Sequence, residues 1–189
     1  MKQINGPEWN RVHYPAILGA HGYQTGVEVG VQAGEFSNLI LAGWPGKLYM
    51  VDCWQEQDGA VYHDIANLPN ERQEVYYQMA RWVAAKYGAR AEIIRAFSPG
   101  AADQFADGSL DFAYLDGNHS HEATLADLGA WWPKLRAGGL MGGHDYMEGE
   151  SHNCTFGVIS ALQKFFPGDV PIYVAEEMWS SWYLFKEPA

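Results

Sequence analysis

Short apolar segments alternate with longer amphipathic segments along most of the chain. Residues 26–31 carry three valines between turn-forming glycines, which predicts a short strand buried on both faces. A helix is predicted from Gly34 to about residue 41, and a second strand over residues 47–52, after the turn at residues 44–46. A strand, a helix and a strand in this order predict that the two strands pair in parallel.

The middle of the chain repeats this alternation. Further strands are predicted over residues 91–97, 110–115 and 138–145. After a loop at residues 58–69, a helix is predicted to begin with Asn70 as its N-cap and to end at Gly88. Its buried face is expected to carry Val75, Met79, Trp82 and Val83.

Three more helices are predicted in the second half of the chain. A short one starts at Ser98, and a longer one is capped by Ser120 and ended by Pro133. Residues 146–153 are predicted to be a loop and residues 155–166 the last helix. The buried face of the longer helix is expected to carry Leu125, Leu128, Trp132 and Leu135.

The end of the chain departs from this alternation. Strands are predicted over residues 172–175 and 182–186, and the connection between them is too short for a crossover helix. They should therefore pair antiparallel. No repeat or linker divides the pattern, so residues 1–189 are expected to form one α/β domain with a mostly parallel sheet.

Composition narrows the class of protein. Apolar residues make up 48% of the chain, which favours a globular core, and the formal net charge of −11 disfavours binding to nucleic acid. The two cysteines, Cys53 and Cys154, are too far apart in sequence to suggest a zinc site or a disulfide framework. No secretory signal is apparent in residues 1–10, and no apolar stretch reaches membrane-spanning length. We therefore expect a cytoplasmic protein that binds no membrane, and the sequence leaves open whether it is a homo-oligomer.

Candidate binding residues follow the first two predicted strands. Ligands of an open parallel sheet gather at the carboxyl ends of its strands. Glu28, Gly30 and Gly34 form a turn in which backbone can approach a ligand, and Asp52 closes the next strand, where it can accept both hydroxyl hydrogens of a ribose. Trp54 is placed to cover an adenine face, although an aromatic residue there is as often part of ordinary packing.

A second polar group follows the fourth and fifth predicted strands, whose ends should be neighbours. Asp116, His144 and Asp145 are expected to converge on one cation, which would bind a substrate hydroxyl. His119 or His121 would then take the hydroxyl proton. For His121 a structural role is the stronger hypothesis.

These residues carry a resemblance to a known family that spans nearly the whole chain. The most specific string runs from Asp111 through Asp116-Gly-Asn-His119, continues through Asp127-Leu-Gly-Ala-Trp, and ends at His144-Asp145-Tyr146. It resembles the class I S-adenosylmethionine-dependent methyltransferases, in particular the small O-methyltransferases related to macrolide-sugar and cephalosporin tailoring enzymes.

The resemblance implies a Rossmann-like fold with a seven-stranded, mostly parallel sheet, helices on both faces and an antiparallel final hairpin. It implies that S-adenosylmethionine binds with its methionine part at residues 28–34, its ribose at Asp52 and its adenine near Ser98. It also implies a divalent ion, magnesium or manganese, at Asp116, His144 and Asp145, with Asp116 bordering the cofactor site as well. Metal-dependent relatives often have two acids at the last pair, and the imidazole of His144 suits manganese better than magnesium.

The expected reaction is methyl transfer to a hydroxyl of a sugar or small metabolite, with His119 as general base and a metal or the Asp145 carboxylate orienting the acceptor. Asp116 is expected to be the third catalytic residue. Residues 1–23 and 58–69 are candidate lids over the acceptor. Two alternatives stay open at this point: a nucleotide-dependent oxidoreductase or epimerase, which the missing G-x-G-x-x-G motif disfavours, and a non-catalytic nucleoside-binding module of the same fold.

Overall fold

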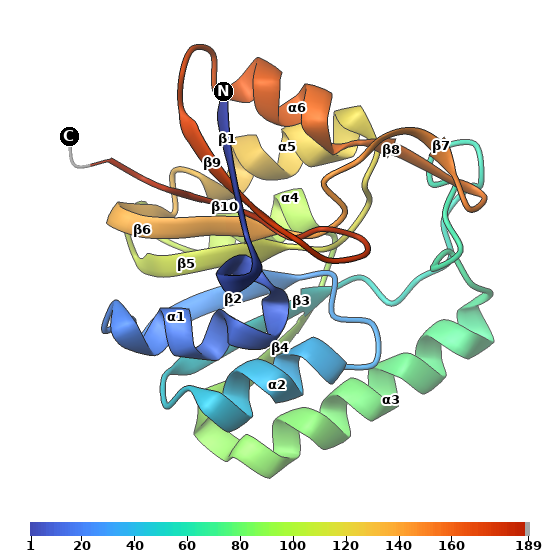
Figure 1. Cartoon of the computed structure of the whole chain (residues 1–189). Coiled ribbons are helices and arrows are strands. Elements are labelled where there is room, and N and C mark those ends of the chain that lie inside the picture. Colours follow the sequence, from blue (N-terminus) through green and yellow to red (C-terminus); the bar gives the residue numbers. More distant parts are fainter. Residues whose placement is uncertain (188–189) are drawn as a thin grey trace.

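One twisted sheet of eight strands forms the centre of the molecule (Figure 1). The computed structural model describes residues 1–187. Across the sheet the strands run in the order β1 (Lys2–Gly6), β9 (Pro171–Ala175), β10 (Trp182–Phe185), β6 (Leu135–Gly143), β5 (Leu110–Leu115), β2 (Thr25–Val29), β3 (Lys47–Asp52) and β4 (Ala91–Arg95).

The strand directions confirm the predicted class. All neighbouring strands are parallel except β10, which is antiparallel to both β6 and β9. The sheet has one strand more than the expected seven, because β1 pairs in parallel with β9 at the edge. Three of the five residues of β1 are exposed, so this edge strand lacks the alternation by which a half-buried strand is recognised.

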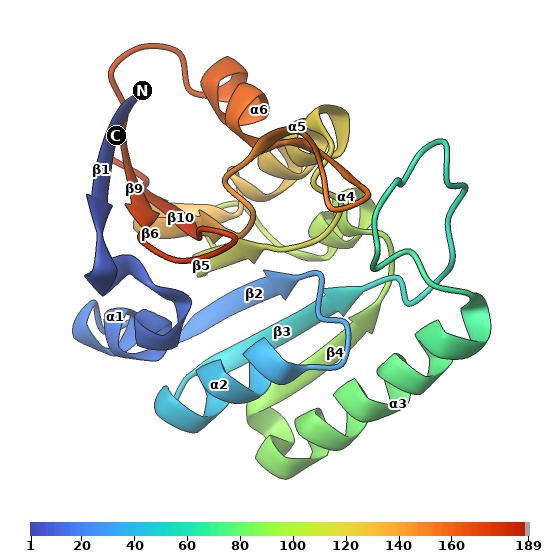
Figure 2. The same ribbon diagram turned by 45° about the vertical axis from the view of Figure 1, so that its right-hand side comes forward.

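Helices cover both faces of the sheet (Figures 1 and 2). The face that carries α1 (Tyr14–Ala20), α2 (Glu35–Gly43) and α3 (Asn70–Tyr87) buries one apolar cluster, which contains Tyr14, Phe36 and Trp44. The opposite face carries α4 (Ser98–Ala101), α5 (His121–Trp131) and α6 (Val158–Phe165) over a second cluster around Trp131. The sheet thus lies between two helical layers, as predicted from the alternating pattern.

Helix α3 faces the sheet differently from the prediction. Val75, Met79 and Trp82 are 48%, 46% and 68% exposed, and of the predicted face only Val83 is buried. The buried residues are Gln73, Ala80, Val83 and Ala84, so the helix is rotated about its axis. Apolar residues surround this helix, and the tertiary packing decides which of them are buried.

The start of α3 also differs. Pro69 occupies the N-cap position, and the side chain of Asn70 accepts a hydrogen bond from the backbone N–H of Glu56 instead of capping the helix. At α5 the prediction is confirmed: the Ser120 hydroxyl accepts from the N–H of Ala123, and the helix ends before Pro133.

The predicted loop at residues 146–153 and the first turn of the predicted last helix are instead a hairpin. Strand β7 (Glu148–Ser151) pairs antiparallel with β8 (Cys154–Gly157), and α6 begins only at Val158. His152 and Asn153 join the two strands with φ angles of 49° and 64°. Asparagine and histidine tolerate this left-handed conformation, which a prediction based on apolar spacing does not detect. None of the described helices is both long and apolar enough to cross a membrane.

Candidate active site

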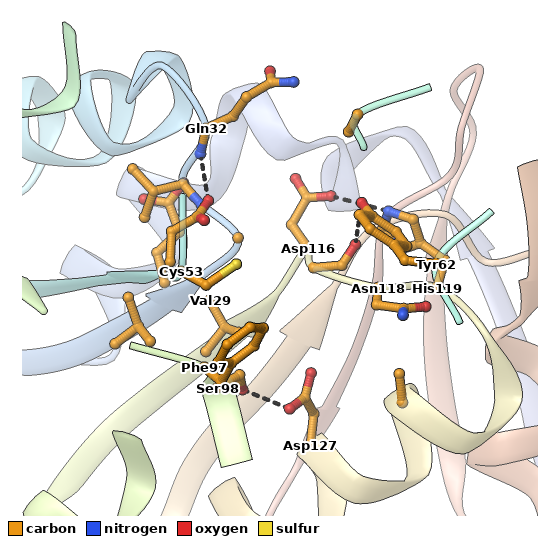
Figure 3. A pocket seen from close by; sticks show the side chains of 18 of the residues that line it. Val29, Gln32, Cys53, Tyr62, Phe97, Ser98, Asp116, Asn118, His119 and Asp127 are labelled. Atoms are coloured by element: carbon orange, nitrogen blue, oxygen red, sulfur yellow. Dashed lines mark hydrogen bonds and ion pairs between the residues drawn. The ribbon is translucent and has the colours of Figure 1, made fainter. Parts of the chain in front are cut away.

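A cavity of about 470 Å³ opens at the carboxyl ends of β2, β3, β4 and β5 (Figure 3). Each of these strands ends in, or is followed by, a polar or glycine residue that lines the cavity, namely Gly30, Asp52, Ser98 and Asp116. The parallel sheet brings the four strand ends together although they are spread over residues 29–115 of the chain.

Gly30 is required at its position for two reasons. Its φ is 85°, and a Cβ placed on it would lie 1.9 Å from the carbonyl oxygen of Asp116. The turn after β2 therefore contacts the turn after β5 through backbone alone. Gly34, with φ of 84°, forms the N-cap of α2 at the end of the same loop. Both glycines were predicted to be in this turn, and the structure agrees.

Asp52 organises the turn from Gly30 to Gly34, which we call the glycine loop. One oxygen of its carboxylate accepts hydrogen bonds from the N–H groups of Val31 and Gln32, both at 2.9 Å, and the other accepts from the N–H of Trp54 at 2.8 Å. A carboxylate has about four acceptor positions, so lone pairs remain on this side chain. Asp52 also lines the cavity. It can therefore hold the loop and accept hydroxyl hydrogens from a ligand.

Trp54 does not lie beside the cavity, in contrast to its predicted adenine-covering position. The side chain is 1% exposed, and its ring packs against that of Tyr77 with 4.9 Å between the ring centroids. Its indole N–H donates a hydrogen bond to the carbonyl of Gln32 at 2.8 Å. Its φ of 44° turns the chain so that the indole enters the core under the glycine loop. Phe97, which is 51% exposed, is among the aromatic residues that line the cavity in its place.

Glu28 is buried below the glycine loop. It accepts a hydrogen bond from the Ser37 hydroxyl at 2.5 Å and lines the cavity. Burial raises the pKa of this carboxyl to about 8, although the Ser37 hydrogen bond and the charge of Arg11 act in the opposite direction. In the protein without ligands, Glu28 is therefore mostly protonated at neutral pH.

A cluster of acids and imidazoles lies where β5 and β6 end. His119 Nε2 is 3.0 Å from an Asp145 oxygen and 3.9 Å from an Asp116 oxygen, and His144 Nδ1 is 3.7 Å from Asp116 and 3.3 Å from Asp145. One ligand atom from each of Asp116, His144 and Asp145 lies within 4.8 Å of the others. The predicted convergence of these three residues is therefore present.

His119, which was expected to act as general base, is protonated at neutral pH in this structure. Burial lowers the pKa of His119, but the hydrogen bond to Asp145 and the charges of Asp145 and Asp116 outweigh it and raise the pKa to about 9. Burial acts to raise the pKa of Asp145, but the hydrogen bonds from His119 and His144 outweigh it and hold this pKa well below its usual range. His119 and Asp145 thus form an imidazolium–carboxylate pair at neutral pH in the protein without ligands.

His121 lies outside the cavity lining and contacts the Ser160 hydroxyl at 2.7 Å, which agrees with its structural role. Of the two histidines weighed as the proton acceptor, His119 is therefore the one that lines the cavity.

The structure adds residues for which the sequence suggested no role. Arg11 lines the cavity from the N-terminal segment, 3.4 Å from an Asp116 oxygen and over the ring of Phe36 at 4.1 Å. Asp127 reaches the cavity from α5. Asp127 is part of the string that carries the family resemblance, but the sequence suggested no role for it. The residues around Arg11 contain no motif that would have predicted its position at the cavity.

Both segments named as lids contribute to the cavity. Residues 1–23 supply Arg11, and the loop at residues 58–69 supplies Val61, Tyr62 and Ala66. This loop is fixed to the β7–β8 hairpin, because the backbone N–H of Thr155 in β8 donates to the carbonyl of His63 at 3.0 Å. The loop therefore closes one side of the cavity.

Comparison with known proteins gives a consistent assignment. Residues 27–146 match the family model of a methyltransferase domain. No curated protein sequence matches the chain significantly. The fold is shared with a protein of Corynebacterium glutamicum, with 17% identity and a TM-score of 0.64 over 97% of this chain and 83% of the other.

Two further structures share the fold. One is an O-methyltransferase from Bacillus cereus in complex with S-adenosylhomocysteine, with 12% identity and a TM-score of 0.65 over 93% of this chain and 80% of the other. The other is a methyltransferase from Geobacter sulfurreducens, with 13% identity and a TM-score of 0.61 over 92% of this chain and 76% of the other.

Proposed function

The chain belongs to the class I S-adenosylmethionine-dependent methyltransferases, and from this premise we propose that it methylates a hydroxyl group of a sugar or another small metabolite. One observation carries the proposal: the cluster of Asp116, His119 and Asp145 adjoins the same cavity that the glycine loop and Asp52 line. Cofactor-binding groups and proton-handling groups thus meet at one place.

In this proposal S-adenosylmethionine lies along the cavity. Glu28 and the loop from Gly30 to Gly34 border the space for the methionine part, with Asp116 opposite. Asp52 is the acceptor for the ribose hydroxyls, and Ser98 borders the adenine. Trp54 acts indirectly, since its indole and backbone N–H groups hold Gln32 and Asp52 in place.

When bound, S-adenosylmethionine supplies an electrophilic methyl group: an acceptor oxygen forms the new C–O bond as the C–S bond breaks and its electron pair returns to sulfur. The chain's own residues hold the acceptor oxygen in line with that carbon, and such positioning supplies much of the rate. Asp116 and Asp145 orient the acceptor. The hydroxyl proton goes to His119 in its neutral form, which is the minor form at neutral pH in the protein without ligands.

The residues of the cluster fit a divalent cation with mixed oxygen and nitrogen ligands. Asp116 and Asp145 offer carboxylate oxygens and His144 offers Nδ1, and manganese accepts such a set more readily than magnesium does. A cation held there would polarise the acceptor hydroxyl and lower its pKa. Arg11, 3.4 Å from an Asp116 oxygen, partly balances the charge of that carboxylate.

The test is calorimetry with S-adenosylhomocysteine, performed with and without manganese or magnesium. We expect the nucleoside to bind in all three conditions and manganese to bind to the wild-type chain but not to Asp145→Asn. Failure of the nucleoside to bind would refute the proposal. Binding without turnover of any hydroxyl acceptor would instead favour a non-catalytic nucleoside-binding module.

Turnover identifies the roles within the cluster. Once an acceptor is found, Asp116→Ala should lower kcat at least about a hundredfold, because a charged group at the reacting centre is lost. His121→Ala is the matched control, since His121 is a neighbouring imidazole outside the cavity lining and should leave kcat within a few-fold. Normal turnover by Asp116→Ala would contradict the arrangement. A dinucleotide-dependent oxidoreductase would bind NAD in the same calorimetric assay, which we do not expect.

A further inference from the structure

Asp127 is a buried carboxylate at the Ser98 end of the cavity. It lies on α5, is 6% exposed, and lines the cavity together with Ser98 and Phe97 (Figure 3). Buried carboxylates are normally paired with a cation or fully hydrogen-bonded. Within residues 1–187, Asp127 forms no ion pair, and the mechanism above gives it no task.

A hydrogen-bonded chain fixes the orientation of this side chain. The indole N–H of Trp131 donates to the Ser98 hydroxyl at 2.8 Å, and that hydroxyl donates to Oδ1 of Asp127 at 2.5 Å. The hydroxyl hydrogen of Ser98 is thereby committed to Asp127 and cannot serve a ligand. Ser98 therefore acts on the cavity through the carboxylate that it holds.

The second oxygen, Oδ2, is left for the cavity. It has no hydrogen-bond partner among the described residues, and it lies 4.0 Å from where a Cβ on Gly117 would stand. In Figure 3 the dashed contact of Asp127 goes only to Ser98. Gly117 therefore places no side chain against this oxygen.

The walls around Oδ2 are suited to a flat aromatic ring. Phe97, Pro99, Ala96 and Ala123 supply apolar surface at the same end of the cavity. Burial raises the pKa of Asp127 to about 6, although the Ser98 hydrogen bond lowers it, so the carboxylate form still predominates at pH 7.5. A planar ring with an N–H group at its edge would satisfy both the walls and the free oxygen.

We propose that Asp127 is the residue that selects adenine, by accepting a hydrogen bond from the exocyclic amino group of the base on Oδ2. The inference rests on the proposed function, since it takes the adenine of the methyl donor to lie at the Ser98 end. It assigns Asp127 as a specificity-determining residue and Ser98 and Trp131 as positioning residues.

The chemistry of the base gives a sharp discrimination. Hypoxanthine carries a carbonyl oxygen where adenine carries the amino group, so its lone pairs would face the lone pairs of Oδ2. A buried hydrogen bond to a charged group contributes about ten- to a hundredfold in affinity. The 6-oxo analogue, S-inosylhomocysteine, should therefore bind at least about tenfold more weakly than S-adenosylhomocysteine.

Asp127→Asn should reverse this preference. The amide oxygen of Asn would accept the Ser98 hydroxyl, because the opposite orientation leaves that hydroxyl without an acceptor. The amide NH₂ would then point into the cavity, where it repels the adenine amino group and donates to the hypoxanthine carbonyl. The change adds no atoms that must be packed, so the fold should be retained.

The experiment is calorimetry at pH 7.5 with the full chain and both nucleosides, for wild type, Asp127→Asn, Asp127→Ala and Asp103→Asn. Asp103 is an exposed acid next to α4 and is the matched control. We expect the ratio of the two Kd values to favour adenine in wild type and Asp103→Asn, to approach one in Asp127→Ala, and to favour hypoxanthine in Asp127→Asn.

The outcomes separate the inference from the function on which it rests. Equal affinity of the wild type for both nucleosides would overturn the role of Asp127 while leaving the methyl-donor site intact, and this measurement does not depend on whether a variant folds. An unchanged ratio in a folded Asp127→Asn would overturn it as well. Absence of binding of either nucleoside to the wild type would overturn the proposed function and this inference together.

Discussion

Replacement of Glu28 by glutamine measures what it costs to keep this carboxyl in the core. Glu28 is 1% exposed and hydrogen-bonded to Ser37, and its pKa is raised from 4.5 to about 8. The folded protein therefore binds more protons than the unfolded chain between these two values. The favourable contribution is fully present below pH 4.5 and is lost as the pH rises towards 8.

The size of the effect follows from the shift. Between pH 4.5 and pH 7 the free energy of unfolding should fall by about 3 kcal/mol because of Glu28 alone. Glutamine has the shape of the protonated acid, can accept the Ser37 hydrogen bond, and does not titrate. The stability of Glu28→Gln relative to wild type should therefore rise by about 3 kcal/mol over the same interval.

The assay is urea unfolding at pH 4.5, 5.5, 6.5 and 7.5 in the absence of nucleosides. Glu176→Gln, a change of an exposed glutamate between β9 and β10, is the control, and its difference from wild type should stay within about 0.5 kcal/mol at every pH. A difference between Glu28→Gln and wild type that does not vary with pH would refute the reasoning, because it would mean that Glu28 is charged in the folded state.

The same buried acid links stability to cofactor binding. The ammonium group of the methionine part would favour the charged form of Glu28, so binding of S-adenosylhomocysteine at pH 7 should release up to one proton. Calorimetry in buffers of different ionisation enthalpy measures this release, which should disappear in Glu28→Gln. Proton release that persists unchanged in the variant would show that another group loses the proton.

Three further changes have expected outcomes. Gly30→Ala should lower the free energy of unfolding by about 3 kcal/mol or more in thermal unfolding, because its φ of 85° and the nearby Asp116 carbonyl exclude a Cβ, and an unaltered midpoint would contradict this. Trp54→Phe removes the hydrogen bond to Gln32 and should cost about 1 kcal/mol in urea unfolding, with weaker S-adenosylhomocysteine binding; unchanged affinity would mean that the loop is held by other contacts. Asp111→Asn should cost about 2 kcal/mol in urea unfolding at pH 7, because Asp111 accepts from Arg136 and from the N–H groups of Gln24 and Thr25. These bonds lower its pKa against the effect of burial, so the cost should shrink as the pH falls below about 4, and a cost independent of pH would argue against a charged Asp111.

The sequence by itself determined the parts of this protein that depend on local pattern. The bounds of β3 and β5 are those predicted from apolar runs between turn residues, and Ser120 and Pro133 mark where α5 begins and ends. Because parallel strands place their carboxyl ends at one edge of the sheet, the meeting of Asp116, His144 and Asp145 also followed from the strand order.

Only the tertiary structure decided which face of α3 is buried, where β1 pairs, and what Trp54 does. Each of these depends on a partner distant in sequence: the sheet face under Val83, the edge of β9, and the Gln32 carbonyl. The approach of Arg11 to Asp116 and the protonation of His119 belong to the same class, since burial and neighbouring charges set them. The spacing of apolar residues along the chain determines whether a segment is a helix or a strand. Which elements contact each other depends on how the whole chain packs.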